Sequence, residues 1–445
     1  MQLDQCQAVR ASGPPRSCCG YSIGLVGLMG FAAGLCAATS GTLPTAVRVL
    51  ALVSITAAPM VVWALWVDQT YLRDSAGLTW RPIRTRDIGR VYIKLVGLAA
   101  TGGMMAAAYW LFPIYRGPLY HTFFELVWIL LPSIAALTIL YVYWLDSRLL
   151  EPKDDGSWHF GCLVVGRWSE VDTNKVRQHV LAWTIKGFFL PIMVGWLGQN
   201  LDWLARPGLF AGTHNFLALA DIAKTAIFTV DLGFAALGYV LTLRIIDGQI
   251  RSPEPTLLGW SIALICYPPI NDLIFTDYLT WSDDYQWQSW IAAQPTMLVI
   301  WGSIIVFIEF LFALATVSFG YRFSNLTHRG IVTHGLYRLT KHPAYVTKCL
   351  SFWMMAIPFI PAQGWDEAAR QSLALAGISL IYWLRARTEE RHLSRDPVYV
   401  EYALWIEKNG IFRWVGQAIP LLRYRPSVHI GPIDDVGKPD FVMTA

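Results

Sequence analysis

Two short segments near the C-terminus of this 445-residue chain carry most of the side chains that could do chemistry. The first, residues 331–345, reads IVTHGLYRLTKHPAY, and the second, residues 385–393, reads RARTEERHL. Together they supply arginines, histidines, tyrosines and two adjacent carboxylates, Glu389 and Glu390. This set suits a ligand with hydroxyl, ammonium and carboxylate groups, because carboxylates accept hydrogen bonds from the first two and arginine forks bind the third.

The composition indicates which elements can position these segments. Hydrophobic residues make up 55% of the chain and charged residues only 15%, with 21 Trp, 19 Tyr and 21 Phe. Soluble domains carry about 25% charged residues, and aromatic rings gather at lipid–water boundaries. The sequence therefore predicts an integral membrane protein. The net charge of +4 predicts no binding to nucleic acid, and seven cysteines without a C-x-x-C spacing predict neither a disulfide framework nor a zinc site.

Apolar stretches long enough to cross a bilayer, about 20 residues each, recur along the chain. Eight clear candidates lie near residues 21–38, 46–67, 92–112, 122–145, 178–198, 218–243, 256–276 and 294–318. Two shorter stretches, near 346–361 and 371–384, form a predicted helical hairpin. We therefore expect an all-α fold, a polytopic membrane bundle of about ten transmembrane helices. Pro268 and Pro269 should break or kink the seventh.

The loops between these stretches differ in positive charge. With a cytoplasmic N-terminus, the outside loops hold only three basic residues, Arg116, Arg206 and Arg370, and the cytoplasmic segments before the hairpin hold 17. Because positive loops stay inside, the sequence predicts that both termini are cytoplasmic. The two chemical segments then lie at the cytoplasmic ends of the hairpin and converge at the membrane surface.

Several charged residues fall within the predicted spans, where an unpaired charge is costly and often functional, among them Lys186, Asp221, Lys224, Asp231 and Glu309. Asp221 and Lys224 are three residues apart on one helix face and can neutralise each other. Asp231 and Glu309 either line a polar cavity or pair between helices, and the sequence leaves both interpretations open.

The two C-terminal segments together resemble a known family. The pattern G-x-Y-x-x-x-(R/K)-H-P-x-Y, a helical hairpin, R-x-R-T-E-E and a later Y-x-x-Y is similar to the isoprenylcysteine carboxyl methyltransferase family, and more broadly to the phospholipid N-methyltransferases. The resemblance covers residues 325–425, about a quarter of the chain. The chain departs from the family pattern at Lys341, Thr347 and Asp396-Pro397, where Arg, Gly and Phe-Gly are usual.

The resemblance implies an S-adenosylmethionine-dependent methyltransferase that acts on a lipid-like or prenylated substrate at the cytoplasmic membrane face. It implies cofactor contacts from Gly335, Tyr337, His342, Pro343, Tyr345 and Glu389, and catalytic roles for Arg385 and Glu390. An arginine can hold a carboxylate acceptor, which needs no general base, whereas an amine or phenol would need a base such as Glu390 or His392.

Local geometry adds two expectations about these residues. Gly335 permits a tight turn, and Pro343 can occupy the first turn of a helix. Arg385 and Glu390 are five residues apart, so on a helix their side chains diverge by about 140°. We therefore expect one of them to face the acceptor and the other to face the cofactor, without a direct pair between them.

Other functions stay open on the sequence alone. Membrane sterol and steroid reductases resemble the family in their C-terminal helices but bind NADPH, and a non-enzymatic scaffold or transporter is a third possibility. The tandem Glu389-Glu390 favours the methyltransferase.

We divide the chain into an N-terminal transmembrane region, residues 1–320, which carries no recognisable motif, and a methyltransferase-like core with a cytoplasmic tail, residues 321–445. Lipids and the substrate are the predicted partners.

Overall fold

The computed structural model describes residues 13–39, 43–80, 87–209, 215–280, 286–361, 364–420 and 422–425. Residues 426–445 of the predicted cytoplasmic tail lie outside these ranges. Within the described residues the chain is mostly helical, and its strands are the two-residue antiparallel pair β1 (Ser252–Pro253) and β2 (Thr327–His328). The predicted all-α fold is confirmed.

Six helices of the described residues are long and apolar enough to cross a membrane: α1 (Tyr21–Thr39), α2 (Thr45–Trp66), α3 (Ile88–Leu111), α4 (His121–Asp146), α6 (Thr173–Leu204) and α10 (Pro295–Val317). In the apolar stretch Pro118–Asp146, which includes α4, only 6% of the most apolar part is buried inside the protein. Apolar side chains so widely exposed require lipid rather than water. The chain is therefore a membrane protein.

The other four predicted spans also contain α-helices, which are 8 to 29 residues long. They correspond to α7 (Phe216–Val240), α8 (Leu257–Leu264), α11 (Pro343–Ala356) and α12 (Trp365–Leu393). The break predicted at Pro268 and Pro269 is confirmed, because α8 ends before them and a π-helical stretch, Asp272–Tyr278, follows. The number of ten spans stays a prediction.

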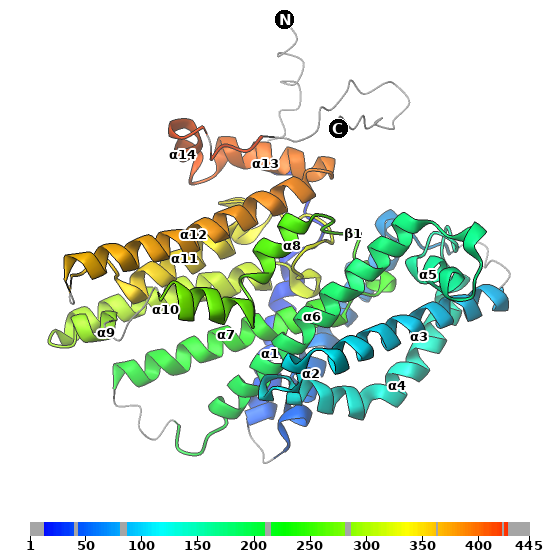
Figure 1. The fold of residues 1–445 in the computed structure, drawn as a ribbon, viewed down its shortest axis with the longest axis horizontal. Coiled ribbons are helices and arrows are strands. Elements are labelled where there is room, and N and C mark those ends of the chain that lie inside the picture. Colours follow the sequence, from blue (N-terminus) through cyan, green and yellow to red (C-terminus); the bar gives the residue numbers. More distant parts are fainter. Residues whose placement is uncertain are drawn as a thin grey trace, which may run out of the picture.

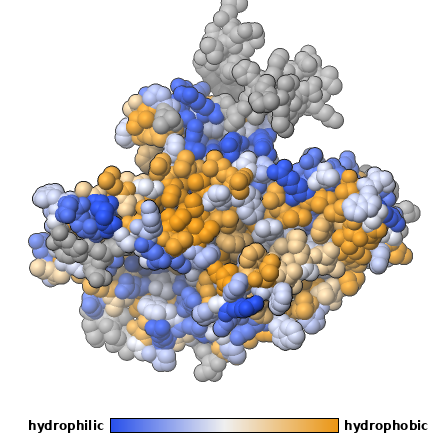
Figure 2. Space-filling view, in the orientation of Figure 1, coloured by the Kyte–Doolittle hydropathy of each residue, from blue (hydrophilic) through white to orange (hydrophobic). Residues whose placement is uncertain are grey.

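The helices form two groups that meet at α6 (Figure 1). On one side α3 and α4 pack together with the short helix α5 (Gly156–Val164), and on the other α7, α10, α11 and α12 pack in sequence. The short α9 (Trp287–Trp290) contacts α11. Helices α13 (Pro397–Asn409) and α14 (Arg413–Ala418) lie beyond the C-terminal end of α12. Figure 2 shows an apolar area in the middle of this face and hydrophilic surface near α13.

A paired charge cluster joins α3, α4 and the start of α5. Lys94, 1% exposed, contacts the Asp146 carboxylate at 2.9 Å and that of Asp155 at 3.5 Å. Arg90 donates two hydrogen bonds of 2.7 Å to the two oxygens of Asp146, which is fully buried. Each buried charge in this cluster therefore has an opposite charge beside it.

The N-terminal segment of the described chain lies against the segment that leads into the candidate site. The backbone N–H of Cys18 donates to the carbonyl of Ile331 at 2.9 Å. The Thr333 hydroxyl donates to the carbonyl of Pro15 at 2.8 Å, and the Thr333 N–H donates to the Ser17 hydroxyl at 3.3 Å. Residues 15–18 thus hold residues 331–333 in place.

Candidate functional site

The hairpin of α11 and α12 brings the two chemical segments together. Gly335 has a φ of +60° at the start of a tight 3₁₀ turn, and a Cβ there would lie 3.0 Å from the Ser318 hydroxyl. Pro343 is the first residue of α11. Both local predictions are confirmed. These two residues shape the segment and do not line the cavities described below.

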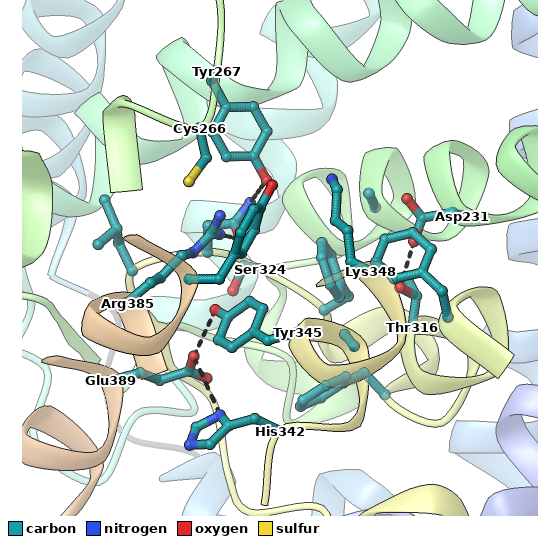
Figure 3. A pocket seen from close by; sticks show the side chains of 18 of the residues that line it. Asp231, Cys266, Tyr267, Thr316, Ser324, His342, Tyr345, Lys348, Arg385 and Glu389 are labelled. Carbon is teal, nitrogen blue, oxygen red and sulfur yellow. Dashed lines mark hydrogen bonds and ion pairs between the residues drawn. The ribbon is translucent and has the colours of Figure 1, made fainter. Parts of the chain in front are cut away.

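The first cavity has a volume of about 250 Å³ and lies among α6, α7, α10, α11 and α12 (Figure 3). Its wall includes five of the residues singled out from the sequence: Tyr337, His342, Tyr345, Arg385 and Glu389. Much of the remaining lining is apolar and comes from the N-terminal region of the chain, including Met193, Trp196 and Phe228. The site therefore draws on both predicted regions of the chain.

A second cavity, of about 380 Å³, lies on the other side of the same segment, between the hairpin and α13–α14. Glu390 and Arg387 line it, together with apolar side chains such as Val346, Ile406 and Phe412. Four residues line both cavities and form the wall between them: Lys341, His342, Tyr345 and Tyr382.

Arg385 lies on α12 in the wall of the first cavity and is 8% exposed. It donates a hydrogen bond to the side-chain oxygen of Asn325, whose amide nitrogen contacts the hydroxyls of Tyr239 at 2.9 Å and Tyr267 at 3.0 Å. Its guanidinium carbon lies 5.4 Å from the ring centroid of Tyr267 and 5.2 Å from that of Tyr345. No carboxylate of the described residues forms an ion pair with it. The guanidinium is held by Asn325 and the two rings, and its positive charge is available to a ligand.

Glu390, five residues later, faces the second cavity and is surrounded by basic side chains. Its carboxylate contacts Lys341 at 2.8 Å, Arg387 at 2.9 Å and His342 at 3.3 Å. Burial raises the pKa of Glu390, but the hydrogen bonds and charges of His342 and Lys341 outweigh burial and hold that pKa at about 2. Glu390 is therefore ionised at neutral pH and is a poor general base. It makes no pair with Arg385, as predicted.

Glu389 faces the first cavity. It differs from Glu390 because adjacent residues on a helix point about 100° apart. Its carboxylate accepts a hydrogen bond of 2.8 Å from the Tyr345 hydroxyl and lies 4.0 Å from the His342 ring nitrogen. The His342 and Tyr345 rings stack, with centroids 5.5 Å apart and planes 12° apart. The tandem glutamates therefore serve different cavities.

His392, the other candidate base, is held on both sides of its ring. Its Nε2 lies 2.9 Å from the Ser252 hydroxyl, and its Nδ1 lies 3.5 Å from the Glu254 carboxylate. Burial lowers the pKa of His392 to about 3, so the ring is neutral at pH 7. Because both nitrogens face protein groups, His392 is committed to structure.

The intramembrane carboxylates that the sequence left open separate into two cases. Asp231 lines the first cavity and accepts a hydrogen bond from the Thr316 hydroxyl. Glu309 does not line either cavity and accepts from the Ser351 hydroxyl at 3.3 Å, between α10 and α11. The predicted contact between Asp221 and Lys224 is present at 3.9 Å.

Sequence reasoning missed several residues of the first cavity. Asn325 follows the predicted span 294–318, Tyr267 lies just before the Pro268-Pro269 break, and no motif marks either residue. Lys348 lies within the predicted span 346–361, so the rule that singled out Asp231 would have found it. Among the described residues, no group of three or more His, Cys, Asp or Glu is arranged to hold a metal ion.

No protein-family model matches the chain, and neither does any curated protein or any solved structure.

Proposed function

We propose that the chain is an integral-membrane S-adenosylmethionine-dependent methyltransferase whose acceptor is a lipid-like molecule, with its reacting group at the cytoplasmic membrane face. One observation carries the proposal: the two segments that resemble the methyltransferase family converge on a single cavity. Tyr337, Tyr345 and Glu389 face that cavity, and so does Arg385.

The residues present fit this cofactor. The Glu389 side chain is 40% exposed and can accept hydrogen bonds from ribose hydroxyls. The stacked His342 and Tyr345 rings offer a flat face for a base, and aromatic faces attract a sulfonium as they attract other cations. When bound, S-adenosylmethionine supplies an activated methyl group, which passes to the acceptor while the carbon–sulfur bond electrons stay on sulfur. The protein then has to align the acceptor and exclude water.

The state of the candidate bases favours a carboxylate acceptor. An amine or phenol must lose a proton, but Glu390 is tied to two cations, Lys341 and Arg387, and His392 is held by Ser252 and Glu254. A carboxylate is already ionised at neutral pH and attacks without a base. Arg385, whose planar fork has no carboxylate partner among the described residues, is suited to hold it.

The second cavity supports a lipid-like acceptor. Its lining is largely apolar, it borders the first cavity along the wall that contains His342 and Tyr345, and it lies between the hairpin and α13–α14. An apolar tail bound there would lie beside the wall that separates it from the first cavity, which Arg385 lines. Burial of each methylene contributes about 0.8 kcal/mol, so a long tail would dominate acceptor affinity.

Ligand binding tests the proposal directly. We expect the protein in nanodiscs to bind S-adenosylmethionine and S-adenosylhomocysteine in calorimetry and not to bind NADPH. Incubation of membranes with cofactor deuterated at the methyl group, followed by mass spectrometry of lipids, should then identify the acceptor. Binding of NADPH alone would instead favour a reductase, and binding of neither cofactor would favour a non-enzymatic role.

We further propose that both termini are cytoplasmic, on the charge distribution of the loops. Leu72 and Tyr278 are 54% and 82% exposed and lie in loops predicted on opposite sides of the membrane. A membrane-impermeant maleimide added to intact cells should label Tyr278→Cys and not Leu72→Cys, with the unsubstituted protein as the background. Labelling of both from the same side would overturn the orientation.

A further inference from the structure

Lys348 is a cation without an anionic partner in the wall of the first cavity. It lies on α11, one helical turn beyond Tyr345, and no ion pair or hydrogen bond joins it to another described residue. Its ammonium instead lies near three aromatic rings, 5.4 Å from the centroid of Phe312, 5.7 Å from that of Tyr382 and 6.0 Å from that of Phe352. A lysine so enclosed is costly unless a ligand supplies negative charge.

Asp231 supplies a negative charge to the same cavity from a different helix, α7. It is 8% exposed, and Thr316 on α10 donates a hydrogen bond to one of its oxygens. In Figure 3 the labelled Lys348, Asp231 and Thr316 lie together, on the side of the cavity away from Arg385 and Glu389. The charges of Lys348 and Asp231 attract each other, but their side chains are too far apart to form an ion pair.

Two opposite charges that face one cavity without touching match a ligand with the reversed pair of charges. A hydroxyl would satisfy only part of each charge, whereas an α-amino acid group offers a carboxylate for Lys348 and an ammonium for Asp231. The methyl donor of the proposed reaction ends in such a group. Tyr337 and Tyr345, which the family resemblance implies as cofactor contacts, line the same cavity.

We infer that Lys348 and Asp231 form the subsite for the amino acid end of S-adenosylmethionine, with Lys348 binding its carboxylate and Asp231 its ammonium. This inference rests on the proposed function. It places the adenosine end nearer Glu389 and the stacked rings of His342 and Tyr345. Arg385 is then free to hold the acceptor, since the cofactor carboxylate has its own cation.

Three ligands separate this role from a structural one. S-adenosylmethionine carries both amino acid charges, its decarboxylated form lacks the carboxylate, and 5′-methylthioadenosine lacks the whole amino acid group. A charge-assisted hydrogen bond contributes about 1.5–3 kcal/mol, which corresponds to about a 10- to 100-fold change in affinity. Calorimetry in nanodiscs with each ligand measures this effect without any need for turnover.

We expect Lys348→Met to weaken S-adenosylmethionine binding about 30-fold while changing the affinity for the decarboxylated form and for 5′-methylthioadenosine less than twofold. Asp231→Asn should weaken both S-adenosylmethionine and its decarboxylated form and spare 5′-methylthioadenosine. Unchanged binding of 5′-methylthioadenosine also shows that each variant is folded. Lys224→Met and Asp221→Asn are matched controls, because this pair lies on α7 but does not line the cavity.

Other results overturn the inference. If Lys348→Met weakens all three ligands equally, the lysine supports the fold rather than the amino acid group. If it leaves S-adenosylmethionine binding unchanged, the cofactor lies elsewhere. Failure of the unsubstituted protein to bind either S-adenosylmethionine or 5′-methylthioadenosine is a different pattern, which would overturn the proposed function itself and this inference with it.

Discussion

Lys94 and Lys348 both lie in helices of this protein, the first buried and the second half-buried, yet their surroundings are opposite. Lys94 lies between two carboxylates, Asp146 and Asp155, at the junction of α3, α4 and α5. Lys348 lies among three aromatic rings beside a cavity and makes no ion pair with a described residue. Removing a charge from water is costly in both places. A charge satisfied by the protein stabilises the fold, whereas a charge left unsatisfied beside a cavity is available to a ligand.

The two arginines of these regions differ in the same way. Arg90 gives both arms of its fork to the buried Asp146. Arg385 donates to a neutral amide, Asn325, and lies near two tyrosine rings. Substitutions in the first region should therefore affect stability, and substitutions in the second should affect ligand binding and turnover.

The largest expected effect is on stability, from Lys94→Met. Removing this cation leaves Asp146 and Asp155 with less compensating charge, and breaking a buried pair costs about 3–5 kcal/mol. We expect the free energy of unfolding in detergent to fall by this amount, while the folded fraction binds S-adenosylmethionine normally. Lys153→Met is the control, since Lys153 is 65% exposed in its contact with Glu170. A stable Lys94 variant with weakened cofactor binding would contradict the division between the two regions.

The pH dependence of stability should depend on Glu390. The pKa of this carboxyl is about 2 in the folded protein, against an ordinary value of 4.5. A lowered folded pKa stabilises the protein above pH 4.5, and this contribution is lost as pH falls from about 5 towards 2. Relative to Glu390→Gln, the unsubstituted protein should lose on the order of 3 kcal/mol across that window. If the free energy of unfolding changes with pH by the same amount in both proteins, Glu390 has no such role.

Arg385→Lys should separate turnover from cofactor binding. A lysine keeps the charge but cannot reproduce the planar fork, so we expect turnover to fall about 100-fold, equivalent to about 2.7 kcal/mol. The dissociation constant of S-adenosylmethionine should change less than twofold. Methyl transfer to the acceptor identified by deuterium labelling gives the first quantity, and calorimetry gives the second. Near-normal turnover would remove Arg385 from the reaction.

The smallest effect should come from Lys224→Met. Lys224 and Asp221 are 3.9 Å apart, and the Asp221 side chain is 61% exposed. Exposed pairs contribute about 0–1 kcal/mol, so stability should change by less than about 0.5 kcal/mol and cofactor affinity should not change. If Lys224→Met lowers the free energy of unfolding as much as Lys94→Met does, the exposure of an ion pair does not determine how much it stabilises this protein.

Local signals explain what could be predicted from the sequence. Gly335, Pro343 and the hairpin follow from backbone chemistry and apolar patterning within a few residues. The extent of α12 was less predictable, because the helix runs over 365–393 while its apolar stretch covers only 371–384. The polar turns at both ends of the helix carry no hydropathy signal.

Contacts between distant parts of the chain explain what could not be predicted. Asn325 accepts a hydrogen bond from Arg385 and is itself held by two tyrosines, Tyr239 and Tyr267, which lie 86 and 58 residues earlier in the chain. Nothing in the local sequence of either tyrosine indicates that contact. The boundary at residue 320 stays a prediction for the same reason, since residues from both sides of it line one cavity.

The contact of residues 15–18 with residues 331–333 bears on how the protein is made. The hydrogen bond from Thr333 to Pro15 joins residues 318 positions apart. A ribosome releases Pro15 long before it makes Thr333, so the early segment must wait at the membrane surface while the intervening helices are inserted. Contacts of such separation form late. The segment that leads into the turn at Gly335 is therefore held in place only after residues 15–18 have packed against it.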